Sequence, residues 1–142
     1  HSMVGFADGA VMAQLGPADM RLPIQYALTY PQRQASAFER LDFAKIAALS
    51  FEKPDTETFR GLALAYEAGR AGGTLPCVMN AANEVAVAAF LAERIRFLDI
   101  YVIIEHTMEK CSVQKAPSLD DLFAADAEAR RVAQGFLQEI GG

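Results

Sequence analysis

The sequence is poor in the positive charge that nucleic-acid-binding proteins need. Of its 142 residues only 13 are Lys or Arg, against 18 Asp and Glu, and the net charge is −5. Binding to phosphates requires basic side chains gathered on one face. Here the only adjacent basic pair is Arg130-Arg131. The composition therefore argues against nucleic acid as a partner.

Long hydrophobic runs and closely spaced cysteines are also missing. No apolar run approaches the ~18–20 residues of a membrane span, and the first residues do not resemble a signal peptide. The two cysteines, Cys77 and Cys111, stand far apart and match no metal or redox spacing. We therefore expect no membrane partner and a reduced, cytoplasmic protein with two free thiols.

Nucleotide-binding and metal-binding motifs are absent as well. The glycines at 69, 72 and 73 lie between two expected helices, whereas a phosphate-binding glycine loop follows a strand. Glu105 and His106 are adjacent on a helix and do not face one another, so they do not make a metal site. We expect His106 to be a solvated surface histidine. The sequence predicts no metal ligand in this chain.

The residues that are present favour a packed core, because 52% are hydrophobic and only 22% are charged. Near the start, Ala7-Asp-Gly9 lies between two stretches of strand character in residues 3–15, which is typical of a β-hairpin. Val4 and Phe6 in the first arm, and Val11 in the second, alternate with other residues, so we expect one face of the hairpin to be buried.

The middle of the chain has weaker patterns. Pro23 predicts the start of a short helix over 24–29, which Pro31 ends. Residues 32–40 lack periodicity and indicate a linker. Residues 41–52 fit either an extended crossing segment or a single helical turn.

From Pro54 onward the pattern is helical, and four helices are expected. The first has an apolar stripe and ends at Gly72-Gly73, the second runs from about Pro76 to Ala92, the third is capped by Asp99, and the fourth begins at Ser118 with Asp121 in a capping box. The expected stripe of the first helix contains Phe59, Leu62, Ala63 and Tyr66; that of the third contains Ile100, Ile103, Ile104, Thr107, Met108 and Cys111; that of the fourth contains Leu119, Leu122, Phe123, Ala129, Ala133, Phe136, Leu137 and Ile140.

The second of these helices combines a nearly uniform apolar surface with Asn80, Asn83 and Glu84. Such a helix belongs in the middle of a bundle. A buried amide or carboxylate must be hydrogen-bonded, or it costs on the order of 1–3 kcal/mol. We therefore expect Asn83 or Glu84 to be buried and to bond another segment. This structural reading is favoured over a catalytic role for the cluster.

Asp19-Met20-Arg21 is the one loop whose composition hints at a ligand. A methionine between opposite charges fills a gap between packed elements or makes an adaptable contact with a planar ligand. The residues alone favour packing.

These segments resemble one known family. Asn80-Ala-Ala-Asn-Glu84 and the apolar run that follows it resemble the C-terminal domain of 1-deoxy-D-xylulose 5-phosphate reductoisomerases. Four other segments match the same family in the same order: His1-Ser-Met-Val4, Asp8-Gly-Ala-Val-Met-Ala-Gln-Leu-Gly16, Asp19-Met-Arg-Leu-Pro-Ile24, and Leu41-Asp-Phe43 continuing to Pro54-Asp55.

The resemblance implies that the chain is part of a longer, NADPH-dependent enzyme. That enzyme converts 1-deoxy-D-xylulose 5-phosphate to 2-C-methyl-D-erythritol 4-phosphate, an isoprenoid precursor, and uses Mg²⁺ or Mn²⁺. The resemblance also implies that Met20 and His1 form a wall of the substrate and cofactor pocket. The metal ligands, the lid and the NADPH domain precede His1 in the family. No catalytic residue and no bound cofactor is therefore expected in this chain, and the isolated chain is expected to be inactive.

Together these inferences predict an α+β fold that is mostly α. Residues 1–31 would be the end of the catalytic domain, 32–53 a linker, and 54–142 a helical C-terminal domain built as a four-helix bundle. The expected partners are the rest of the parent chain and a second copy in a homodimer. The alternative is a stand-alone helical scaffold or binding module that pairs with a partner through its hairpin.

Overall fold

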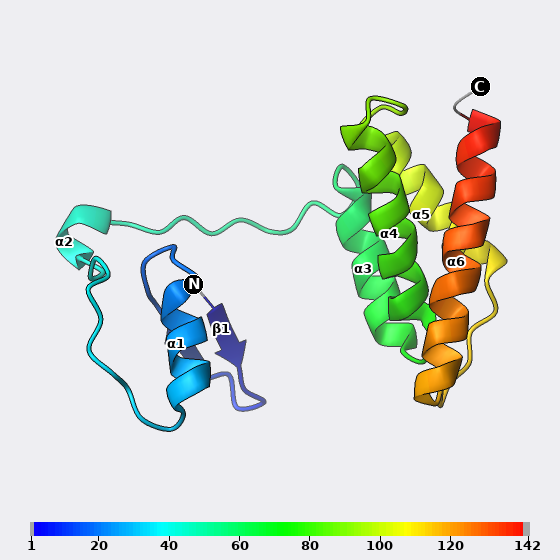
Figure 1. Ribbon diagram of the computed structural model, residues 1–142. Helices are drawn as coiled ribbons and strands as arrows, with labels where there is room; N and C mark the ends of the chain where they lie inside the picture. The colour runs from blue at the N-terminus through cyan, green and yellow to red at the C-terminus, as the bar shows by residue number, and fades with distance from the viewer. Residues whose placement is uncertain (1, 141–142) are drawn as a thin grey trace. The chain divides into compact units, whose positions relative to one another are not determined.

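The computed structural model describes residues 2–140, and the chain divides into two compact units, residues 1–52 and 53–142. Within the described residues the fold is mostly helical, with six helices and one two-stranded antiparallel sheet (Figure 1). This agrees with the mostly α class of α+β fold that the sequence predicts.

The first unit begins with the predicted hairpin, β1 (Ser2–Gly5) and β2 (Val11–Gln14). In the connecting turn the Gly9 N–H donates to the Phe6 carbonyl at 3.0 Å, and the Asp8 carboxylate accepts from the backbone N–H two residues on at 2.9 Å. Gly9 has φ +88°, a conformation that a residue without Cβ adopts at no steric cost. The turn signal at Asp8-Gly9 is therefore confirmed.

The prediction of a single apolar face on the hairpin is wrong. The register pairs Val4 with Met12 and Gly5 with Val11, so Val4 and Val11 point to opposite faces of the ribbon. Both faces carry apolar side chains, and every strand residue is exposed in the described structure. A strand pair that is apolar on both faces is typical of a sheet covered on both sides.

Two helices complete the first unit. α1 (Arg21–Thr29) begins three residues before the predicted range of 24–29, and Pro23 occupies its first turn, where a missing N–H is tolerated. α2 (Phe43–Ile46) is a single helical turn, one of the two conformations expected for 41–52. The Asp42 side chain caps it by accepting from the Ala44 N–H at 2.9 Å.

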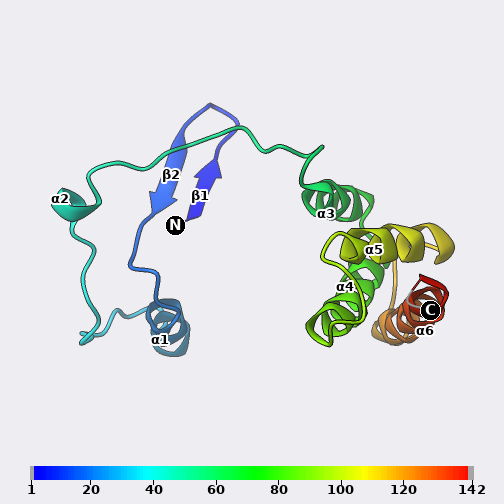
Figure 2. The same cartoon turned by 90° about the horizontal axis from the view of Figure 1, so that it is seen from above.

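The second unit packs four helices: α3 (Arg60–Ala71), α4 (Leu75–Leu91), α5 (Asp99–Lys110) and α6 (Leu119–Ile140). α4 contacts all three of the others, as its nearly uniform apolar surface predicts (Figures 1 and 2). Four of its six buried residues are alanines, which allows close helix approach. The six are Leu75, Val78, Ala81, Ala82, Ala86 and Ala89.

The apolar face predicted for α3 is wrong. Phe59 and Tyr66 are exposed, at 60% and 46%, while Leu64 and Ala68 are buried. A Cβ added at Gly61 would lie 2.6 Å from the ring of Tyr101 in α5. The absence of a side chain at Gly61 therefore allows this face of α3 to pack closely against α5. The helix carries two apolar stripes, and the one with smaller side chains faces the core.

α5 buries the predicted stripe from Ile100 to Met108, and only Cys111 at its end is half-buried. The predicted N-cap is wrong: Asp99 is the first helical residue, and its carboxylate accepts from the Arg96 N–H at 2.8 Å. A side chain of the first helical residue thus stabilises the turn that precedes the helix.

α6 begins with the predicted reciprocal capping box. The Asp121 N–H donates to Ser118 Oγ at 3.2 Å, and the Ser118 N–H donates to Asp121 Oδ2 at 2.8 Å. Of its predicted stripe, Ala129, Ala133 and Leu137 are buried. Three others are exposed, contrary to expectation: Leu119, Phe123 and Ile140.

Among residues 2–140, no helix is both long enough and apolar enough to cross a membrane.

Candidate functional site

The loop before α1 is fixed by one carboxylate. Asp19 Oδ1 accepts from the Arg21 N–H at 2.9 Å, and both carboxylate oxygens accept from the Arg21 guanidinium at 2.5–3.0 Å. These hydrogen bonds hold the pKa of Asp19 at about 2, first through the guanidinium and then through the backbone N–H. The carboxylate is therefore ionised throughout the neutral range, and the pair forms a closed local clamp.

Met20 lies between the two members of this clamp. Its backbone is already helical, with φ −66°, and its carbonyl accepts from the Ile24 N–H at 3.2 Å. The side chain is 71% exposed, so it does not fill a gap within the first unit. The packing interpretation favoured by the residues alone is not supported here.

Met20 also lines a pocket of about 600 Å³ within the first unit. The wall consists of residues 16–20, the first turn of α1, and side chains that include Tyr26 and Arg33. The Arg33 guanidinium lies 4.1 Å from the centre of the Tyr26 ring. A pocket lined by methionine, an aromatic ring and a stacked cation suits a planar or anionic ligand.

The segment after α1 folds back onto that helix. The Arg21 guanidinium lies 4.6 Å from the Phe38 ring centre, and Gln25 Nε2 donates to the Ala35 carbonyl at 3.3 Å. Thr29 Oγ1 donates to the Gln32 carbonyl at 2.8 Å. The residues expected to be a linker therefore brace the Asp19–Arg21 clamp.

The other predicted pocket residue, His1, lies outside the described residues. Its role stays a prediction.

The cluster predicted on α4 lies at the surface, so the expectation of burial is wrong. Asn80 and Glu84 are exposed and Asn83 is half-buried. Asn80 Nδ2 donates to Glu84 Oε1 at 3.0 Å, and the Arg130 guanidinium donates to Glu84 Oε2 at 2.7 Å. Glu84 thus joins α4 to α6, through side chains and not through the backbone.

Arg130 is the centre of this network and was missed by sequence reasoning. It also donates two hydrogen bonds to Asp126, at 2.6 and 3.0 Å, one turn earlier in α6. These partners raise the pKa of Arg130, and Arg130, with Asn80, lowers the pKa of Glu84. The i, i+4 spacing of Asp126 and Arg130 was the available signal.

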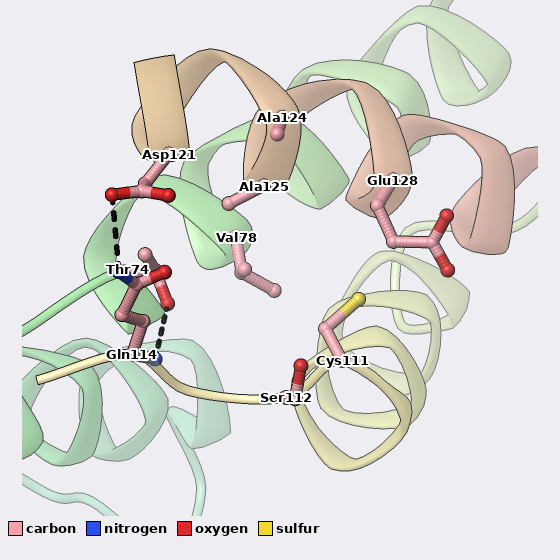
Figure 3. Close-up of a pocket in the computed structure, with 9 residues that line it drawn as sticks. All are labelled: Thr74, Val78, Cys111, Ser112, Gln114, Asp121, Ala124, Ala125 and Glu128. Carbon is pink, nitrogen blue, oxygen red and sulfur yellow. Dashed lines mark hydrogen bonds between the residues drawn. The ribbon is translucent and has the colours of Figure 1, made fainter. Parts of the chain in front are cut away.

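A second pocket, of about 230 Å³, lies in the helical unit between the start of α6 and the segment after α5 (Figure 3). The Gln114 N–H donates to Thr74 Oγ1 at 3.0 Å, and the Gln114 side chain donates to Asp121 at 3.0 Å. Burial raises the pKa of the Cys111 thiol at its edge. A thiol that stays protonated is a poor nucleophile. The groups here fasten the α5–α6 connection and offer no reactive centre.

The two remaining candidate residues, Cys77 and His106, make contacts that indicate packing roles. Burial raises the pKa of Cys77, whose thiol donates to the Leu122 carbonyl at 3.5 Å. His106 is half-buried and stacks on Phe136, with ring centres 3.8 Å apart, so the expectation of a solvated histidine is wrong. The ring covers apolar surface between α5 and α6.

No group of three or more His, Cys, Asp or Glu side chains within residues 2–140 is arranged to hold a metal ion.

Comparison with known proteins gives consistent matches. The family model described as the DXP reductoisomerase C-terminal domain matches residues 15–132. The 1-deoxy-D-xylulose 5-phosphate reductoisomerase of Bacteroides fragilis is 60% identical over 137 residues, which is 96% of this chain and 35% of the relative. The enzyme of Acetivibrio thermocellus is 56% identical over 138 residues, 97% of this chain and 36% of the relative. The chain thus spans about a third of the length of the curated relatives it matches.

Solved structures agree. The 1-deoxy-D-xylulose 5-phosphate reductoisomerase from Zymomonas mobilis in complex with NADPH matches with a TM-score of 0.86 and 48% identity, over 96% of this chain and 36% of that one. A DOX-P reductoisomerase in complex with NADPH, fosmidomycin and magnesium matches with a TM-score of 0.84 and 35% identity, over 99% and 36%. This chain therefore belongs to the 1-deoxy-D-xylulose 5-phosphate reductoisomerase family and corresponds to the C-terminal domain of these enzymes.

Proposed function

We propose that the chain is part of an NADPH-dependent reductoisomerase. The full-length enzyme converts 1-deoxy-D-xylulose 5-phosphate to 2-C-methyl-D-erythritol 4-phosphate in isoprenoid precursor biosynthesis. One observation carries the proposal. The chain is similar along 99% of its length to a DOX-P reductoisomerase whose structure holds NADPH, fosmidomycin and magnesium, and it keeps an exposed Met20 at the edge of a pocket.

The chain's own contribution is one wall of the reaction pocket. Met20 and His1 are proposed to bound the space shared by nicotinamide and substrate. The thioether of Met20 is polarisable and its stem is flexible, which suits contact with a planar ring. A dry apolar wall also excludes water from a reacting centre.

The cofactor and the metal need more than this chain provides. NADPH, when bound, supplies the hydride, and the protein orients it. The pocket beside Met20 has no glycine-rich turn for a pyrophosphate, and residues 2–140 contain no convergent set of metal ligands. The nucleotide and the Mg²⁺ or Mn²⁺ are therefore proposed to be held by other parts of the parent enzyme, and no chemical step is assigned to this chain.

The helical unit is proposed to act as a brace. In this proposal residues 1–31 end the catalytic domain, 32–53 connect, and 54–142 form a four-helix bundle that supports the catalytic domain. The cluster of Asn80, Asn83 and Glu84 would have a structural role in it. The Glu84–Arg130 ion pair between α4 and α6 supports that role.

A homodimer is proposed as the working assembly. The hairpin has two unpaired edges among the described residues, and its exposed faces carry Val4, Val11 and Met12. Edge strands of this kind pair readily with another strand. The same feature supports the second candidate function, a stand-alone module that binds a partner by adding its hairpin to the partner's sheet.

The test uses the full-length chain that contains this sequence. It is expected to oxidise NADPH only when both 1-deoxy-D-xylulose 5-phosphate and Mg²⁺ or Mn²⁺ are present. The 142-residue chain alone is expected to show neither turnover nor micromolar binding of NADPH in a calorimetric titration. Full-length protein without this activity, or an active isolated chain, would refute the proposal.

A further inference from the structure

The loop around Met20 is held by several side-chain and backbone contacts. Three residues in a row take part, and each is fixed by a different kind of contact. Asp19 bonds the backbone and the side chain of Arg21, Arg21 lies over Phe38, and the Met20 carbonyl accepts from Ile24. The Met20 side chain makes no contact of this kind, and Met20 is 71% exposed.

The direction of the clamp explains this arrangement. A carboxylate one residue before Met20 bonds the N–H one residue after it, so the Met20 backbone is enclosed by a short hydrogen-bonded ring. The guanidinium binds the same carboxylate with two nitrogens, which removes the rotational freedom that a single hydrogen bond would leave. The backbone of Met20 is therefore set before any ligand arrives.

We infer that Asp19 and Arg21 are positioning residues that hold Met20 in place against the cofactor and substrate. The inference rests on the proposed function, because it assigns the clamp to the pocket of that reaction. Asp19 and Arg21 act through Met20 and need not touch the ligand. Phe38 adds a further contact to the clamp, because the Arg21 guanidinium lies over its ring, 4.6 Å from the ring centre.

The clamp does not depend on pH within the neutral range. Asp19 has its pKa lowered to about 2, so the pair stays charged throughout the neutral range. The expected consequence is a permanent positional constraint and not a switch.

The chain contains a matched control. In the turn before α5, the Asp99 carboxylate accepts from the Arg96 N–H at 2.8 Å and from the Arg96 guanidinium at 3.2 and 3.3 Å. This is the same chemistry in the helical unit, and neither residue lines the pocket beside Met20. Asp99→Asn therefore measures what losing such a clamp does to the protein in general.

The experiment compares Asp19→Asn, Met20→Ala, the double variant and Asp99→Asn in the full-length enzyme. Asp19→Asn should lower kcat/KM by about tenfold to a hundredfold, as expected for a misplaced contact, and should weaken NADPH binding. Asp99→Asn should leave both values unchanged. In the Met20→Ala background, Asp19→Asn should change kcat/KM by less than about twofold, because the clamp has nothing left to position.

Additive effects of Asp19→Asn and Met20→Ala would overturn the inference and leave the proposed function standing. A Met20→Ala variant equal to wild type would overturn the inference and the assignment of Met20 to the pocket wall, while its activity would leave the reductoisomerase function standing. A second readout needs no turnover. With ¹³C-methyl-labelled methionine, the Met20 signal, assigned from Met20→Leu, should be single and sharp in wild type and shifted or broadened in Asp19→Asn. An unchanged signal would overturn the inference even in an inactive protein.

Discussion

Among single residues, the glycines show how closely the helical unit is packed. Gly73 has φ +62°, and a Cβ added there would overlap the carbonyl of Gln114. The same carbonyl accepts from the Thr74 N–H at 3.0 Å, so the turn between α3 and α4 lies directly against the segment before α6. At Gly69, near the end of α3, an added Cβ would meet no atom within 4 Å.

This contrast gives a paired prediction. Gly73→Ala should lower the free energy of unfolding by about 2–4 kcal/mol, from the left-handed backbone and the backbone overlap together. Gly69→Ala should raise it by about 0.5–1 kcal/mol, because alanine restricts the unfolded chain more than glycine does. Urea denaturation of both variants measures the difference. Equal effects would show that the turn rearranges freely.

At the scale of helices and strands, a predicted buried face was correct where the sequence offered only one apolar face. It was wrong where the sequence offered two. α5 has one apolar stripe, and that stripe is buried. α3 has two, and hydrophobicity favoured Phe59 and Tyr66, whereas packing selected Leu64 and Ala68. Alternation was visible in each arm of the hairpin, but the turn sets the register, and with it which residues share a face.

The candidate site divides in the same way. The Met20 loop was noticed because methionine between opposite charges is unusual in composition. The contact of Arg33 with Tyr26 joins residues 7 positions apart, and that of Phe38 with Arg21 joins residues 17 positions apart, and neither spacing is a recognised local pattern. The sequence singled out the Asn80 cluster but not how deeply it is buried. Its burial depends on the position of α6, which brings Arg130 to Glu84 at the surface.

The link between α4 and α6 predicts an acid dependence of stability. Glu84 has a lowered pKa because Arg130 and Asn80 bond its ionised form. A lowered pKa means that its stabilisation is present above the ordinary value of 4.5 and is lost as the pH falls through the folded value. Glu84→Gln should therefore lower the urea midpoint at neutral pH, and its curve should meet that of wild type in acid.

The control is Glu109→Gln, which changes an exposed glutamate of α5 that has no ion pair among residues 2–140. Its urea midpoint should follow that of wild type at every pH. A gap between Glu84→Gln and wild type that persists unchanged into acid would contradict the ion-pair account. It would indicate a packing defect instead.

For the whole molecule, the two units differ in what covers their apolar residues. Among residues 53–140, fifteen buried hydrophobic residues form a continuous core shared by the four helices. In the first unit both faces of the hairpin are exposed. The helical unit therefore has the core of a domain that folds alone, whereas the first unit needs further chain or a second copy to cover its strands.

Sedimentation of two chains tests this difference. Residues 53–142 should be monomeric, and residues 1–142 should self-associate through the hairpin. Val11→Lys and Val4→Lys should each weaken the association, because the register places them on opposite faces and both faces are apolar. A monomeric 142-residue chain, or association that persists in residues 53–142, would exclude the hairpin as the interface.

The central claim is that this chain forms a pocket wall at Met20 and contributes a brace elsewhere. Hydrogen exchange of the full-length chain, with and without NADPH and Mg²⁺, tests it most directly. The account predicts that added ligand slows exchange in residues 16–26 and leaves exchange in α4 and α5 nearly unchanged. Ligand binding that protects the helical unit while residues 16–26 exchange as before would contradict it.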